Sequence, residues 1–153
     1  MQGNVLPDGQ VLLAKVGAIA CAIPIARVIE TMRPLPIEPV GDGPGFVRGV
    51  AIIRGVPTIV VDTARLLGVA DGGAPTRFVT VRAGERALAL TFDAVVAVRH
   101  LDAAVLGELP PLLQLVARDA VAAIATLDKG LLVVLETARA ISDAQWTALE
   151  RRP

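Results

Sequence analysis

The chain has 153 residues, of which 54% are hydrophobic and 20% are charged, with 15 basic and 15 acidic residues. This composition is typical of a folded protein with a sizeable core, and it argues against a disordered chain. The charges are spread evenly, so neither nucleic-acid binding nor attraction to an anionic membrane surface is indicated. The longest uncharged apolar segment, residues 16–26, is too short for membrane insertion, which needs roughly 20 residues.

The first predicted element is a β-hairpin near the N-terminus. Residues 11–16 and 18–25 are apolar runs on either side of Gly17, which allows a tight reversal. Residues 26–31 continue as a short extended or helical piece. Residues 33–45 are rich in proline and then in glycine, which predicts a long loop.

A second hairpin follows the loop. Residues 47–53 and 56–61 are rich in β-branched side chains, which favour strands. The pair at residues 54–55, Arg-Gly, supplies the corner between these strands. Asp62 is then expected to cap a helical turn over residues 63–67 by accepting backbone N–H groups.

The second half of the chain resembles the first. After a linker-like stretch at residues 70–75, runs at 77–82 and 87–98 repeat the first hairpin, and runs at 121–127 and 131–135 repeat the second. Two units of about 65 residues are therefore predicted. Units of this size bury too little surface to be robust alone, so they should share an interface or exchange strands.

The C-terminal segment predicts a short helix. Ser142 and Gln145 have the spacing of a capping box, in which each side chain bonds to the other residue's backbone N–H. Trp146 and Leu149 then share one helix face. We interpret Trp146 as an anchor that docks the helix on a lobe, with a partner-binding role as the alternative.

No group of residues predicts an enzyme, a metal site or a cofactor. Cys21 lies within an apolar strand and cannot form an internal disulfide, because it is the only cysteine. His100 is expected at the surface. Asp62 and Asp93 could form a carboxylate pair, but a cap and a strand-end residue explain them better. Residues 41–45 are glycine-rich, yet they lack the lysine and hydroxyl residue of a phosphate loop.

The hairpin of residues 48–55, Arg-Gly-Val-Ala-Ile-Ile-Arg-Gly, leads through a β run to Asp62 and resembles the signature of the CheW family. Residues 92–95, Phe-Asp-Ala-Val, match a step of the same family in the second half. The resemblance covers residues 11–141. CheW proteins are cytoplasmic adaptors that couple chemoreceptors to the histidine kinase CheA.

The sequence departs from the family pattern at several positions. Ile52 and Ile53 replace the usual Asn-Leu pair, and Pro57 lies two residues before the usual proline position. In the second half, Ala123 stands where glycine is usual and Glu136 replaces a typical aspartate. The family's asparagine lies near its interaction surface. Ile52 is therefore expected to affect which receptor is bound more than it affects the fold.

The resemblance implies an all-β fold with short helices. Residues 10–141 are expected to form one CheW-like domain of two pseudo-symmetric SH3-like lobes, each a five-stranded β-barrel. The lobes would span about 10–70 and about 75–141, and strands could be exchanged between them. A C-terminal helix would occupy residues 142–153.

The resemblance also implies two contact surfaces. An apolar groove between the lobes would receive the tip of a receptor's helical hairpin, and the alternative for each of its residues is an ordinary core position. The groove residues would be Leu12, Ile25, Val28, Val95, Val98 and Leu101. A partner-binding hairpin would include Gly49, Arg54 and Gly55. Arg54 could fork onto a carboxylate, or it could be a solvated turn residue.

The expected function is therefore a non-enzymatic, cytoplasmic adaptor between chemoreceptor tips and the regulatory domain of a CheA-type kinase. One alternative is a CheW-like adaptor of a divergent pathway, controlling pili or a second messenger, that binds only the kinase. Another is a small-ligand-binding β-barrel protein or enzyme. That alternative requires a polar pocket with perturbed titratable groups.

Overall fold

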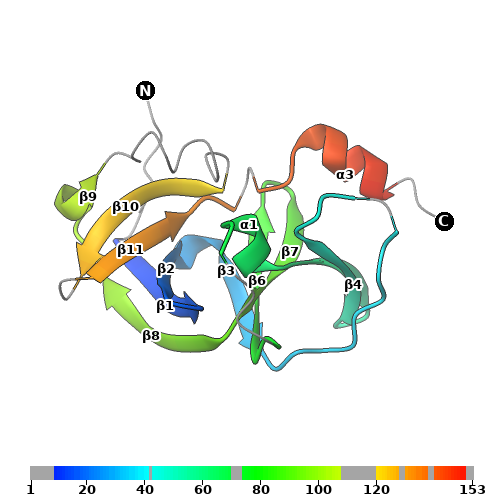
Figure 1. The fold of residues 1–153 in the computed structure, drawn as a ribbon, viewed down its shortest axis with the longest axis horizontal. Coiled ribbons are helices and arrows are strands. Elements are labelled where there is room, and N and C mark those ends of the chain that lie inside the picture. The colour runs from blue at the N-terminus through cyan, green and yellow to red at the C-terminus, as the bar shows by residue number, and fades with distance from the viewer. Residues whose placement is uncertain are drawn as a thin grey trace.

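A computed structural model describes residues 9–41, 43–69, 74–107, 120–127, 130–137 and 140–150. It consists of two β-sheets that lie side by side, with short helices between and above them (Figure 1). The expected mostly-β class is confirmed. Within the described residues, no helix is long and apolar enough to cross a membrane.

Within the described ranges, one sheet has six strands and the other has five. The six-stranded sheet has the order β8 (Ala94–His100), β1 (Gln10–Val16), β2 (Ile19–Pro24), β11 (Gly130–Leu135), β10 (Val121–Leu127) and β9 (Leu106–Gly107). The five-stranded sheet has the order β3 (Val28–Met32), β6 (Arg77–Ala83), β7 (Arg86–Phe92), β5 (Val56–Val61) and β4 (Val47–Ile53). The helical pieces are η1 (Ile25–Arg27), α1 (Thr63–Leu66), η2 (Ala103–Val105) and α3 (Asp143–Glu150).

The two sheets repeat one topology. In each sheet, an antiparallel hairpin is joined to a second hairpin by a parallel pair, β5 with β7 in one and β11 with β2 in the other. The strand order therefore matches over five positions, from β8 and β3 to β10 and β4, and β9 has no counterpart among the strands of the five-stranded sheet. Each sheet combines strands from both halves of the sequence, so the division near residue 70 does not coincide with a division between the sheets.

The run predicted over residues 87–98 is two strands that belong to different sheets. The chain crosses between the sheets at Asp93, whose backbone N–H donates to the Lys15 carbonyl at 2.8 Å. The Asp93 carboxylate in turn accepts from the Gly17 N–H at 2.7 Å. Asp93 is thus the strand-end residue that the sequence indicates, and its contacts explain why the apolar run is interrupted.

Both faces of each sheet are apolar. On β1, Leu12 and Ala14 point into a core cluster shared with the five-stranded sheet, whereas Val11 and Leu13 point into a cluster confined to the six-stranded sheet. A third cluster, which includes Phe78, belongs to the five-stranded sheet alone. The shared cluster joins the two sheets, as the predicted interface between small units requires.

The hairpin of β4 and β5 has the predicted corner, with Arg54 at φ 50° and Gly55 at φ 78°. Asp62 caps α1, because its Oδ1 accepts from the Arg65 N–H at 3.1 Å. An equivalent backbone hydrogen bond closes the second hairpin in both halves of the chain. The Asp62 N–H donates to the Phe46 carbonyl, and the Glu136 N–H donates to the Ala120 carbonyl, each at 2.7 Å.

The predicted capping box of α3 is present. The Gln145 N–H donates to Ser142 Oγ at 3.2 Å, and the Ser142 N–H donates to Gln145 Oε1 at 2.9 Å. Trp146 and Leu149 are buried in the shared core cluster, so Trp146 anchors the helix as interpreted. The helix lies over the five-stranded side of the molecule (Figure 1).

Candidate protein-docking site

Four of the predicted groove residues meet in the shared core cluster. Leu12 on β1 is buried there, and Ile25 on η1, Val28 on β3 and Val95 on β8 pack against it while remaining partly exposed. These residues come from both sheets, so the structure places them along the line where the sheets join. Leu12 is a core residue, and the other three supply apolar surface beside it.

The remaining two predicted groove residues are placed differently. Val98 lies opposite Leu12 in the β1–β8 register, and it is 53% exposed. Leu101 is buried in the cluster confined to the six-stranded sheet, with Val11 and Leu13. Val98 therefore adds exposed apolar surface on β8, whereas Leu101 lies in a different core cluster.

Position 49 requires glycine for a structural reason that the sequence does not reveal. It forms a bulge on β4 at φ 149°, and a Cβ atom built there would lie 2.0 Å from the Glu38 carbonyl oxygen. Glu38 and Val50 exchange two backbone hydrogen bonds of 2.8 Å beside it. Gly49 thus lets the loop after β3 approach β4 closely and cover part of the free edge of that strand.

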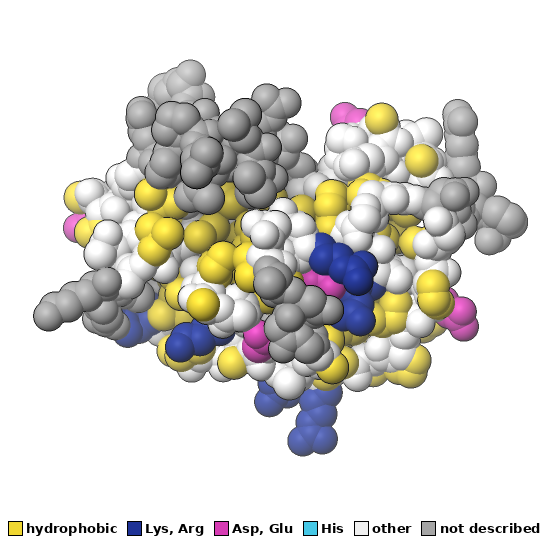
Figure 2. Space-filling view, in the orientation of Figure 1, with side chains coloured by type: hydrophobic (Ala, Val, Ile, Leu, Met, Phe, Trp, Pro, Cys, Tyr) yellow, Lys and Arg dark blue, Asp and Glu magenta, His cyan; other side chains and the backbone are white. Residues whose placement is uncertain are grey.

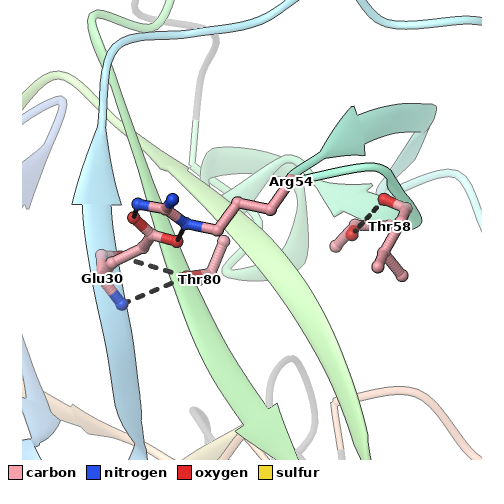
Figure 3. A network of polar contacts seen from close by, with 5 residues as sticks. Glu30, Arg54, Thr58 and Thr80 are labelled. Carbon is pink, nitrogen blue, oxygen red and sulfur yellow. Dashed lines mark hydrogen bonds and ion pairs between the residues drawn. The ribbon is translucent and has the colours of Figure 1, made fainter.

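Arg54 forks onto a carboxylate of its own chain. Its Nε and Nη2 donate to Oε2 and Oε1 of Glu30, each at 2.7 Å (Figure 3). β3 and β4 are the two edge strands of the five-stranded sheet, so the pair connects one edge strand to the hairpin that contains the other. The hydrogen bonds from Arg54 lower the pKa of Glu30, and the pairing raises the pKa of Arg54.

Glu30 is held in place by a second residue. Its backbone N–H donates to Thr80 Oγ1 at 3.1 Å, and the Thr80 hydroxyl donates to the Glu30 carbonyl at 3.3 Å (Figure 3). Glu30 is not among the predicted site residues, because no periodic or turn pattern connects it to a residue 24 positions away. An acidic residue among the apolar residues of a strand is the signal that could have indicated it.

The tip of the β4–β5 hairpin exposes apolar side chains around this ion pair. Ile52 is 61% exposed and Val56 is 59% exposed, on either side of Arg54. The Arg54 side chain itself is 77% exposed. Apolar residues next to an exposed guanidinium are typical of a protein–protein contact rather than of a catalytic site.

The remaining residues considered as catalytic or metal-binding candidates lie in surroundings that do not favour those roles. Cys21 is buried, and burial raises the pKa of its thiol to about 12, so the nucleophilic thiolate is not formed near neutral pH. Asp62 and Asp93 bind different backbone groups. His100 is exposed at the end of β8. Among the described residues, no group of three or more His, Cys, Asp or Glu side chains could hold a metal ion.

A groove of about 730 Å³ lies between α3, the start of β5 and the loop after β3. Its charged residues include Arg86 and Glu150, which pair through hydrogen bonds of 2.9 and 3.2 Å. This pairing lowers the pKa of Glu150 and raises that of Arg86, so both pKa values move away from neutrality. Groups shifted in this way do not favour proton transfer at neutral pH.

Comparison with known proteins agrees with the family resemblance of the hairpin at residues 48–55. A family model described as a CheW-like domain matches residues 10–145. The structure is similar to the crystal structure of the scaffolding protein TtCheW from Thermoanaerobacter tengcongensis, with a TM-score of 0.74 and 22% sequence identity. The similarity covers 84% of this chain and 88% of that one, and at this identity it concerns the fold. No protein with a curated description matches the sequence.

Proposed function

Because the chain belongs to the CheW family of chemotaxis scaffold proteins, we propose that it couples chemoreceptors to a CheA-type histidine kinase. In this proposal it is a cytoplasmic adaptor that holds a receptor tip and the kinase regulatory domain against each other without catalysing a reaction. The observation that carries the proposal is the shared apolar cluster, which reaches the surface where the two sheets join, at Ile25, Val28 and Val95.

The receptor tip would dock on this apolar surface. A helical hairpin can place one apolar face into a groove whose walls are small aliphatic side chains. Ile25, Val28 and Val95 are partly exposed there, and Val98 is the most exposed of the predicted groove residues. Leu12 supports the surface from below, while Leu101 is remote from it in the core.

The kinase regulatory domain would contact the tip of the β4–β5 hairpin. Ile52 and Val56 supply apolar area, and Arg54 supplies a positive charge held in a defined position by Glu30. Gly49 and Gly55 contribute through the backbone shape of the hairpin. A contact limited to the tip of one hairpin would be modest in area and individually reversible, as the repeated contacts of an array require.

Signalling would follow from differences in contact energy. If a change in the receptor alters the relative stability of two arrangements of the bound kinase domain, the adaptor shifts the population between them. Both partner surfaces adjoin sheets that share one core cluster, so the adaptor would transmit such a shift without a large rearrangement of its own.

The test is co-purification with a receptor cytoplasmic fragment and with a kinase regulatory domain. We expect Val28→Asp and Val98→Asp to lose the receptor fragment and keep the kinase domain, and Arg54→Glu to do the reverse. Leu131→Asp is the matched control, because Leu131 is also exposed and lies outside both surfaces. Retention of both partners by all three site variants would refute the assignment of these surfaces.

Ile52 favours a second candidate, an adaptor of a divergent pathway that binds the kinase but no receptor. It is 61% exposed at a position where CheW sequences usually have asparagine. An exposed isoleucine suits an apolar protein contact better than a polar one. In the same experiment, this candidate predicts that the wild-type protein retains only the kinase domain, and that Ile52→Asn weakens that retention.

A further inference from the structure

Two arginines lie close to one carboxylate beside α1. Arg48 Nη1 on β4 is 3.8 Å from Asp62 Oδ2, and Arg65 Nε on α1 is 3.7 Å from the same oxygen. Basic side chains surround an acidic one near the centre of the face drawn in Figure 2, next to the position of α1 in Figure 1. Among the described residues, the pairs Arg54–Glu30 and Arg86–Glu150 each join one arginine to one glutamate.

The Asp62 carboxylate does not saturate either guanidinium. Its Oδ1 accepts the capping hydrogen bond from the Arg65 backbone, and both distances from Oδ2 are longer than a hydrogen bond. Asp62 is largely buried, whereas the side chains of Arg48 and Arg65 are 35% and 59% exposed. The site therefore presents a net positive charge and guanidinium N–H donors to the solvent.

The fold does not require this arrangement, as the other half of the molecule shows. Phe46 and Asp62 are bonded as Ala120 and Glu136 are, so Arg48, two residues after Phe46, corresponds to Ala122. Ala122 occupies the matching position on β10 with no charge. The position of Arg48 is therefore charged in one half only, which indicates a role other than folding for Arg48, whereas Arg65 recurs in the sequence as Arg139.

We propose that Arg48 and Arg65 bind an acidic segment of a protein partner, with a partner carboxylate hydrogen-bonded between the two guanidiniums. The inference deepens the proposed function, since the partner would be one of the two signalling proteins, but it concerns a surface that the proposed groove and hairpin tip do not include. Both guanidiniums lie within ion-pair distance of one aspartate, and Arg65 Nη1 also donates to the Gly45 carbonyl at 3.4 Å. A further carboxylate would therefore gain charge-assisted hydrogen bonds at a reduced cost in side-chain entropy.

The first experiment measures the Kd of each partner over about 50 to about 500 mM NaCl. We expect Arg48→Glu/Arg65→Glu to weaken one partner by at least about tenfold and to flatten its salt dependence. Arg77→Glu/Arg82→Glu, an equal charge change at exposed positions of β6, should leave both Kd values within about twofold. Arg48→Lys/Arg65→Lys should recover part of the binding, because lysine keeps the charge but not the fork. Equal Kd values and salt slopes for the two reversal variants would overturn the proposal.

A second experiment is independent of the signalling partners and of the folding of variants. A short oligoglutamate peptide is titrated into the isotope-labelled wild-type protein, and the arginine side-chain Nε–H resonances are followed by NMR, with oligoglutamine as the control. We expect the Arg48 and Arg65 signals to shift with oligoglutamate and not with oligoglutamine, even if the protein binds neither a kinase domain nor a receptor fragment. Equal shifts at all exposed arginines, or none at these two, would overturn the proposal.

Discussion

Glu30 on the edge strand β3 and Arg54 at the corner of the β4–β5 hairpin are joined by two hydrogen bonds, each 2.7 Å long. The pair lies at a corner where Arg54 has a left-handed backbone, a conformation that non-glycine residues rarely adopt. The bidentate contact therefore fixes the position of the β4–β5 hairpin tip relative to the edge strand β3.

Removing one member of this pair should change the hairpin more than it changes global stability. We expect Glu30→Gln and Arg54→Lys each to lower the Tm by no more than about 4 °C, because exposed ion pairs contribute little. The exchange Glu30→Arg/Arg54→Glu should restore part of the loss. Calorimetry of the four proteins checks this, and an exchange variant less stable than both single variants would contradict it.

Gly49→Ala should be far more damaging than Gly55→Ala. Both positions have positive φ, but a Cβ atom at Gly49 would overlap the Glu38 carbonyl, while the space at Gly55 is open. We expect a loss of more than about 2 kcal/mol in unfolding free energy for Gly49→Ala and about 1 kcal/mol for Gly55→Ala. Denaturant titration measures both values, and similar losses would argue against the close approach of the loop to β4.

The two paired glutamates should make stability depend on acidic pH. Hydrogen bonds from arginine lower the pKa of Glu30 and of Glu150 from the ordinary value of 4.5. Their contribution is thus present above that value and is lost as the pH falls through the lowered pKa. We expect Glu30→Gln/Glu150→Gln to have a lower Tm than the wild type at about pH 7 and a smaller difference at about pH 3. A constant difference at both pH values would contradict the assignment.

Trp146→Ala should detach α3 before it unfolds the sheets. Trp146 is buried in the shared cluster, and the Arg86 guanidinium lies 5.0 Å from its ring centroid. Truncating a buried aromatic side chain costs about 3 kcal/mol, which is more than an eight-residue helix can supply by itself. Hydrogen exchange should show loss of protection over residues 143–150, with the strands still protected. Ala144→Ser, on the exposed face, serves as the control.

The thiol of Cys21 should be unreactive in the folded protein. Burial raises its pKa from 9.0 to about 12, so stability is retained below about pH 9 and decreases as the pH rises above it, because only the unfolded chain ionises there. We expect no alkylation by iodoacetamide at about pH 8 under native conditions and rapid alkylation in denaturant. Mass spectrometry distinguishes the two, and full native labelling would show that β2 opens readily.

Features that depend on neighbouring residues follow directly from the sequence. The reversal at Arg54-Gly55, the Asp62 cap and the Ser142–Gln145 box each involve positions at most three apart, so backbone preference and short side-chain reach determine them. The two hairpin repeats likewise indicate a mostly-β fold of two similar parts. The signature hairpin of residues 48–55 identifies the family, which the match over residues 10–145 confirms.

The tertiary structure alone decided which strands and which charges meet. Equivalent hairpins occur in both halves, so the apolar pattern does not distinguish β8 from β3 as the neighbour of β1. Because apolar clusters lie on both faces of each sheet, Leu12 and Leu101 look alike in the sequence yet belong to different clusters. Glu30 meets Arg54, and Arg48 and Arg65 share Asp62, only when packing has brought distant strands and turns together. Such contacts arise from the balance of burial over the whole chain, and no local preference encodes them.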